Sequence, residues 1–239
     1  MEKMRQRGDG ACLLCGQPLV YWNEERDMTC AFCGGTFKSR AGCEAGHFVC
    51  DNCHAQKGLE AVMEICRRSR ETDPIRIAEE IMENPYVYMH GPEHHVLVGA
   101  ALLTAYHNAG GDLDFEEALS EMLSRGKVYP GGSCGFWGCC GAAVSTGMFM
   151  SVALKATPLT TASWALSNEV TARTLQKIAE LGGPRCCKRN SFTAIKTASD
   201  FVKEKLGVDM PLQDKIVCRF YPENRECKRK NCPYYPESC

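Results

Sequence analysis

The sequence has no apolar run long enough to cross a membrane and almost no net charge. Its longest apolar-rich stretches, 96–106 and 140–154, fall short of the roughly 18 residues that a spanning helix needs. The N-terminus is polar, with Lys3, Arg5 and Arg7 but no apolar segment behind them, so we expect no secretory signal. The net charge of −1 argues against a general nucleic-acid or membrane coat. These absences predict a cytoplasmic protein that does not act at a membrane.

Cysteine is what the sequence has in excess, with 17 among 239 residues. Cytoplasmic chains rarely keep structural disulfides, so this number points to metal, iron–sulfur or thiol chemistry. The apolar content of 44 % and charged content of 24 % allow a sizeable core, and the length predicts one or two domains.

Eight potential metal ligands form four pairs before residue 54. The pairs are Cys12 with Cys15, Cys30 with Cys33, Cys43 with His47, and Cys50 with Cys53. A C-x2-C turn brings two thiolates close enough to share one metal ion, and two such pairs complete a tetrahedral zinc site. Because this polar segment cannot build a core, its fold depends on metal. The sequence therefore predicts two zinc sites.

Two pairings of these ligands are open. A sequential pairing joins the first pair with the second and the third with the fourth. An interleaved pairing joins the first with the third and the second with the fourth. We favour the sequential one, because the 14-residue loop between Cys15 and Cys30 suits a plain zinc ribbon. His54 is a spare candidate ligand.

Helical periodicity begins after the last of these pairs. Capping residues, Pro and Gly mark the helix ends, as at Asp73-Pro74 and Gly182-Gly183. We expect helices at 55–69, 75–82, 94–108, 114–124, 139–154, 160–181 and 184–205. The predicted fold is mostly α: a zinc-ribbon-like module at 1–54, a helical bundle of about six or seven helices at 55–207, and a cysteine-bearing tail at 208–239 packed on the bundle.

Nine later cysteines fall in three places, whereas Cys66 stands alone at a helical core position. The first place follows the Gly-rich segment 130–135 and holds Cys134, Cys139 and Cys140. Amides at a helix start lower a thiol pKa, so we interpret this place as redox-active or cluster-binding. The alternative is a tight helix crossing that Gly141 and Gly147 permit.

The second place is the pair Cys186 and Cys187 at a helix start, with Arg185, Lys188 and Arg189 around it. Positive neighbours stabilise thiolates. Adjacent cysteines rarely bind one metal together, so we expect one to face the site and the other to pack.

The third place is the tail, with Cys218, Cys227, Cys232 and the terminal Cys239. Cys232 precedes Pro233, which is common at iron–sulfur sites, and a third zinc knuckle is the alternative. Residues 183–239 carry 12 basic and 7 acidic groups, which is too little support for a nucleic-acid partner.

Three histidines, His90, His94 and His95, cluster at a helix start. Metal binding or acid–base work is one interpretation, and we favour the structural one.

Three segments resemble an uncharacterised cysteine-rich domain family of anaerobic bacteria and archaea. They are Gly91-Pro92-Glu93-His94-His95 with the apolar run through Leu103, the Gly-Gly-Pro-Arg-Cys-Cys-Lys-Arg segment at 182–189, and the Cys218, Cys227, Cys232-Pro-Tyr tail. That family occurs joined to or beside radical-SAM proteins. This chain has no C-x3-C-x2-C motif, so radical-SAM chemistry would belong to a partner. A shorter segment, Gly138-x-Cys140-Gly141-Ala142 with Gly147, is similar to the C-GCAxxG-C-C probable redox proteins, although Cys-Gly-Ala stands where they have Gly-Cys-Ala. Neither resemblance implies a reaction.

The leading hypothesis is a metal-binding accessory protein in redox or sulfur handling. It would hold two zinc ions and an iron–sulfur cluster, and would serve a radical-SAM or methyltransferase partner. The candidate cluster ligands are Cys134, Cys139, Cys186, Cys218, Cys227 and Cys232, and the candidate catalytic thiols are Cys140 and Cys187. The alternative is a zinc-dependent adaptor or regulator without catalysis. A third hypothesis is a thiol enzyme that uses Cys140 or Cys187 as its nucleophile. Whether the chain is an enzyme, and its oligomeric state, stay open.

Overall fold

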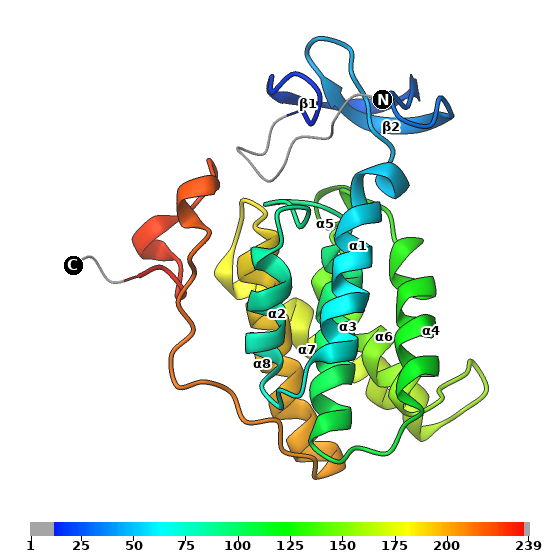
Figure 1. The fold of residues 1–239 in the computed structure, drawn as a ribbon, viewed down its shortest axis with the longest axis vertical. Helices are drawn as coiled ribbons and strands as arrows, with labels where there is room; N and C mark the ends of the chain where they lie inside the picture. Colours follow the sequence, from blue (N-terminus) through cyan, green and yellow to red (C-terminus); the bar gives the residue numbers. More distant parts are fainter. Residues whose placement is uncertain (1–11, 237–239) are drawn as a thin grey trace.

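A small metal-ligand module stands on one end of a helical bundle, and a cysteine-bearing tail lies beside that end (Figure 1). The computed structural model describes residues 12–236. Residues 1–11 of the predicted module and 237–239 of the predicted tail, Cys239 among them, lie outside this part. The predicted class, mostly helical with a small zinc-ribbon-like module, is confirmed.

The module is built on one antiparallel hairpin. Strand β1 (Leu19–Thr29) pairs with β2 (Thr36–Cys43), so that Leu19 lies opposite Cys43 and Thr29 opposite Thr36. The register shifts between Tyr21 and Arg26, where β1 has several residues more than its partner. Such a bulge bends a hairpin and increases its twist.

Eight helices follow within the described residues. They are α1 (Asp51–Arg68), α2 (Pro74–Glu83), α3 (His94–Asn108), α4 (Phe115–Lys127), α5 (Ser133–Phe136), α6 (Gly141–Ala153), α7 (Ala162–Leu181) and α8 (Cys187–Leu206). Seven of them overlap the ranges that the periodicity predicts, with ends that differ by up to four residues. The short α5 is additional. Two single 3-10 turns, Tyr221–Glu223 and Arg229–Asn231, lie in the tail.

Helix α3 is the centre of the bundle (Figure 1). It packs against α1, α2, α4, α6 and α8, and nearly all its residues from Val96 to Tyr106 are buried. A helix that is apolar on every side belongs inside a protein. Its first residues, His94 and His95, therefore lie at a fixed place beneath the module.

Glycines bring α6 close to its neighbours. A Cβ atom on Gly147 would lie 2.0 Å from Thr171 Oγ1 of α7, and one on Gly99 of α3 would lie 3.1 Å from the backbone oxygen of Ser145. The close helix crossing that the sequence suggested at Gly147 is confirmed. It holds Cys140, just before α6, close to α3.

The tail returns along the bundle. The Thr193 and Tyr234 hydroxyls lie 3.0 Å apart, and the Tyr234 ring packs on Phe192 of α8. Gln213 donates its backbone N–H to the Asp73 carboxylate at 2.8 Å. The boundaries predicted at residues 54 and 207 stay predictions.

No helix within residues 12–236 combines the length and the apolar character that a bilayer crossing requires.

Asp73 tests how the tail is attached. Its buried carboxylate caps α2 through the N–H of Ile75 and also accepts the N–H of Gln213, both at 2.8 Å. Asp73→Ala removes both bonds, so we expect a loss of about 2–3 kcal/mol in the free energy of unfolding. Urea denaturation measures it.

Asp114→Ala is the matched control, because Asp114 caps α4 through Glu117 alone. We expect about 1 kcal/mol there. Equal losses in both variants would contradict a role for Asp73 in holding the tail.

Candidate metal centres and a thiol-lined cavity

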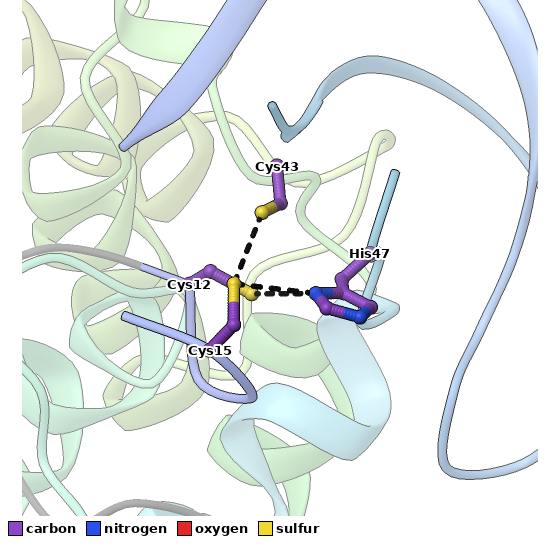
Figure 2. Close-up of side chains that lie close together, drawn as sticks. All are labelled: Cys12, Cys15, Cys43 and His47. Atoms are coloured by element: carbon purple, nitrogen blue, oxygen red, sulfur yellow. Dashed lines mark hydrogen bonds between the residues drawn. The ribbon is translucent and has the colours of Figure 1, made fainter. Parts of the chain in front are cut away.

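The first group of ligands lies at the open end of the hairpin. Cys12 and Cys15 precede β1, Cys43 ends β2, and His47 follows it. Figure 2 shows the four side chains pointing toward one another. His47 Nδ1 lies 3.8 Å from Cys12 Sγ and 3.3 Å from Cys15 Sγ, and the Cys15 and Cys43 sulfurs are 3.4 Å apart. Ligands of one tetrahedral zinc ion lie roughly 3.5–3.8 Å apart, so the donor set and spacing fit such an ion.

The second group joins the hairpin turn to α1. Cys30 and Cys33 lie in the turn, Cys50 is the N-cap of α1, and Cys53 is in its first turn. The Cys33 and Cys50 sulfurs are 3.9 Å apart, and the Cys50 N–H donates to Cys30 Sγ. In each group all four ligand atoms lie within 4.8 Å of one another. The structure therefore contains two ligand tetrads, each able to hold a metal ion.

The preference for sequential pairing was wrong, because the tetrads are interleaved. The hairpin is the reason. Antiparallel pairing places the start of β1 opposite the end of β2, which brings the Cys12 and Cys15 pair to Cys43. Cys30 and Cys33 lie in the hairpin turn, where Cys30 Sγ accepts the N–H of Cys50 at the start of α1. Loop length alone does not carry this information.

Backbone N–H groups lower the pKa of one thiol in each tetrad. The N–H of Gln17 is the main cause that lowers the pKa of Cys15 to about 6. Burial opposes ionisation of Cys30, but N–H groups of Cys50, Cys33 and Phe32 outweigh it and lower its pKa to about 6. Burial raises the pKa of Cys43 and Cys50. Thiolate is the form that binds metal, so each tetrad has one ligand already ionised at neutral pH.

A cavity of about 570 Å³ lies between the module and the bundle. Two contacts join the hairpin to the bundle around this cavity, and a third joins the start of α1 to the loop before α5. Asp51 accepts the N–H of Gly131 at 2.7 Å, Arg185 donates to the Tyr21 hydroxyl, and the Arg40 guanidinium lies 5.5 Å from the Phe136 ring. None of these residues was singled out as a site residue by its sequence motif, because each contact joins segments far apart in the chain.

The cavity collects thiols and imidazoles from separate elements. Its wall includes the cysteines Cys134, Cys140, Cys186 and Cys187 and the histidines His47, His54, His90, His94 and His95. The two candidate catalytic thiols, Cys140 and Cys187, thus share one cavity. Cys139 is not in this wall, and its backbone oxygen accepts the Tyr129 hydroxyl. The catalytic assignment itself stays a prediction.

Burial raises the pKa of both candidate catalytic thiols, Cys140 and Cys187. For Cys140 it outweighs the side-chain N–H of Asn190, which lies 3.4 Å from the sulfur. For Cys187 it outweighs Arg185 and the N–H of Gly91, and the pKa rises to about 12. The expectation that helix starts would lower the pKa of these thiols was wrong, because removal from water destabilises each thiolate more than the hydrogen bonds stabilise it.

The histidines beneath the module are neutral at physiological pH. Burial lowers the pKa of His54 and His90 to about 4, and also lowers that of His94 and His95. His54, the spare ligand, joins neither tetrad; its Nδ1 lies 3.8 Å from a Glu93 carboxylate oxygen. His94 Nδ1 lies 3.5 Å from the other. The buried Glu93, whose pKa burial raises to about 7, was missed by sequence reasoning.

The tail cysteines gather with Cys186. Cys186, Cys218, Cys227 and Cys232 line a second, small cavity of about 20 Å³. Cys186 also lines the large cavity, as does Cys187, the next residue. The expectation that one of the pair would merely pack is therefore too simple, because each borders a cavity. Burial raises the pKa of Cys186, and that of Cys218 to about 12.

The remaining thiol, Cys66, is fully buried in the core as expected. All cysteines between residues 12 and 236 are free thiols. Apart from the two tetrads, no three Cys, His, Asp or Glu ligand atoms in this part of the chain lie within 4.8 Å of one another.

The tetrads predict two tightly bound metal ions per chain. Cys30→Ser should lose one of them and open the hairpin, because a metal ion in such a site supplies on the order of 10 kcal/mol of folding free energy. Elemental analysis counts the ions, and hydrogen exchange of residues 12–50 reports the opening.

Cys139→Ser is the control and should keep both ions. A Cys30→Ser protein with unchanged metal content and unchanged exchange would contradict the tetrad.

Comparison with known proteins finds a family match for the helical part of the chain and the tail. No curated protein and no solved structure matches the chain significantly. A family model described as "Family of unknown function (DUF5714)" matches residues 62–235, which is more than half of the chain. The match contains both cavity thiols and the whole tail group, and leaves out the two tetrads. The chain belongs to this DUF5714 family of unknown function.

Proposed function

We propose that this protein is a zinc-braced iron–sulfur protein that acts in cytoplasmic redox or sulfur handling. The observation that carries the proposal is the meeting of four cysteines, Cys186, Cys218, Cys227 and Cys232, around one small cavity. They come from the start of α8 and from three points of the tail. Four thiols from one chain are the usual ligands of an iron–sulfur cluster.

The spacing of these sulfurs favours a cluster over a single zinc ion. Each tetrad keeps its four ligand atoms within 4.8 Å, whereas the tail cysteines form no group that compact. A four-iron cluster is larger than one ion, and each of its cysteines binds a different iron. Its four cysteine sulfurs are therefore spread more widely.

Hydrogen-bond donors contact the sulfurs of Cys186 and Cys227. The N–H of Arg189 lies 3.4 Å from Cys186 Sγ, and the N–H of Arg229 lies 3.3 Å from Cys227 Sγ. The side-chain amide of Asn224 also donates to Cys186, at 3.5 Å. Such bonds stabilise the charge of cluster thiolates and tune the reduction potential.

Charge and shielding fit the same interpretation. Arg189 and Lys228 border the cavity, and a cluster with four thiolates carries net negative charge. Met89, Phe220 and Tyr235 form apolar wall on the other sides. Apolar surroundings limit access of water to a metal centre.

Zinc is the ion that we propose for the tetrads. Three thiolates with one imidazole, and four thiolates, are both structural zinc sets, and neither leaves a position open for a substrate. The free thiols support the cytoplasm as the location. A radical-SAM or methyltransferase protein is the proposed partner, and this step rests on the motif resemblance alone.

Metal analysis of anaerobically purified protein tests the cluster. We expect two zinc ions, together with iron and acid-labile sulfide in equal amounts, and a broad visible absorbance that bleaches on reduction. Cys227→Ser removes a half-exposed cluster ligand and should lower the iron content, because one iron loses its protein ligand.

Cys139→Ser should leave iron and absorbance unchanged. Three zinc ions with neither iron nor sulfide would overturn the cluster and favour the zinc-dependent adaptor instead.

A further inference from the structure

We propose that the cavity beneath the module binds an exchangeable transition-metal ion. The ligands are the Nε2 atoms of two histidines and the sulfurs of two cysteines: His94, His95, Cys140 and Cys187. This site is separate from the tetrads and from the proposed cluster, and it adds a binding activity to the proposed function.

The hydrogen bonds of the two histidines fix their tautomers. Nδ1 of His94 lies 3.1 Å from the backbone oxygen of Gly91, and Nδ1 of His95 lies 3.0 Å from that of Tyr129. A carbonyl oxygen only accepts, so each Nδ1 carries the hydrogen and each Nε2 keeps a lone pair. A backbone carbonyl on Nδ1 is the usual support of a metal-binding histidine.

The lone pair of His94 has no donor to satisfy it. Its Nε2 atom is buried and has no hydrogen-bond partner within residues 12–236, while the residue itself lines the cavity and is 1 % exposed. A buried polar atom without a partner is costly, and an ion is one of its standard explanations.

The position of His95 is fixed by its neighbours. A Cβ atom at residue 141 would lie 2.2 Å from Cδ2 of the His95 ring, so the ring occupies space that only a glycine leaves free. The Tyr129 ring packs edge-on against it, with centroids 5.2 Å apart. The imidazole is therefore packed against Gly141, the residue after Cys140.

The two thiols enter from different helices. Cys140 is the N-cap of α6, and Cys187 is the first residue of α8. The Asn190 amide donates to Cys140 Sγ at 3.4 Å, and the Gly91 N–H points to Cys187. Two imidazoles and two thiols that release their protons on binding suit zinc, iron, copper or cobalt rather than magnesium or calcium.

The spacing of the ligands makes the site exchangeable. No three of these atoms lie within 4.8 Å of one another, as the ligand atoms of each tetrad do. Binding must draw them inward, and that movement costs affinity relative to a preformed tetrad. A cavity of about 570 Å³ leaves space for the movement. The ion would then be one that the protein takes up and releases.

Cobalt(II) is the probe that tests the site. Protein purified anaerobically with its own metals is treated with a mild chelator and then titrated with cobalt(II). We expect one additional equivalent to bind, with a visible thiolate-to-cobalt absorption that chelator reverses while zinc and iron contents stay constant. Cys187→Ser and His95→Gln should each weaken cobalt binding at least tenfold, and Cys139→Ser should not.

The metal contents keep the outcomes distinct. His95→Gln leaves every proposed zinc and iron ligand in place, so unchanged zinc and iron contents show that it has folded. Absence of the cobalt band, its persistence in both Cys187→Ser and His95→Gln, or loss of one zinc for each cobalt bound would overturn the cavity site. A normal cobalt band in protein without iron would leave this site standing and remove the proposed cluster instead.

Discussion

The convergence of eight cysteine and histidine side chains on two tetrads is the constraint on which we expect the upper part of this molecule to depend. The module is too polar to build its own core, so the tetrads do the work that apolar packing does in the bundle. The second tetrad matters most, because two of its ligands begin α1. It transmits the position of the hairpin turn directly to a bundle helix. The first tetrad then fixes the open end of the hairpin above α3 and α6.

The cavity is a consequence of this bracing. Its floor consists of the ends of α3, α6 and α8, and parts of its roof, including Tyr21 and Arg40, belong to the module. Few direct contacts join roof and floor, among them the bond from Arg185 to Tyr21. We therefore expect metal loading of the tetrads to affect the shape of the cavity. The family match covers the floor and leaves out most of the roof.

The start of α8 divides the later cysteines. Cys186 borders both the small tail cavity and the large one, whereas Cys187 borders the large one alone. A cluster at the first would lie one residue from a metal ligand at the second. That proximity would give the proposed cluster a short electron-transfer path to a metal ion in the large cavity. It links the two proposals, although neither depends on the other.

Local patterns in the sequence predicted the helices and the tetrad ligands, but they did not predict contacts between segments far apart in the chain. The periodicity found seven helices, and the paired spacing found all eight tetrad ligands, because both signals are local. The predicted pairing of the metal ligands was wrong, because it depends on how β2 folds back on β1. The expected lowering of the thiol pKa was wrong too, because Cys140 and Cys187 are near helix starts in sequence but are half-buried in the fold, where loss of water raises their pKa. Glu93 gave no signal, as its burial against His54 and His94 depends on tertiary packing.

X-ray absorption at the zinc and iron edges of anaerobically purified protein tests the division of cysteines most directly. The account predicts zinc bound by sulfur with a minority of nitrogen, and iron bound by sulfur with the short iron–iron distances of a cluster. Zinc alone, or iron without a neighbouring iron, would contradict it.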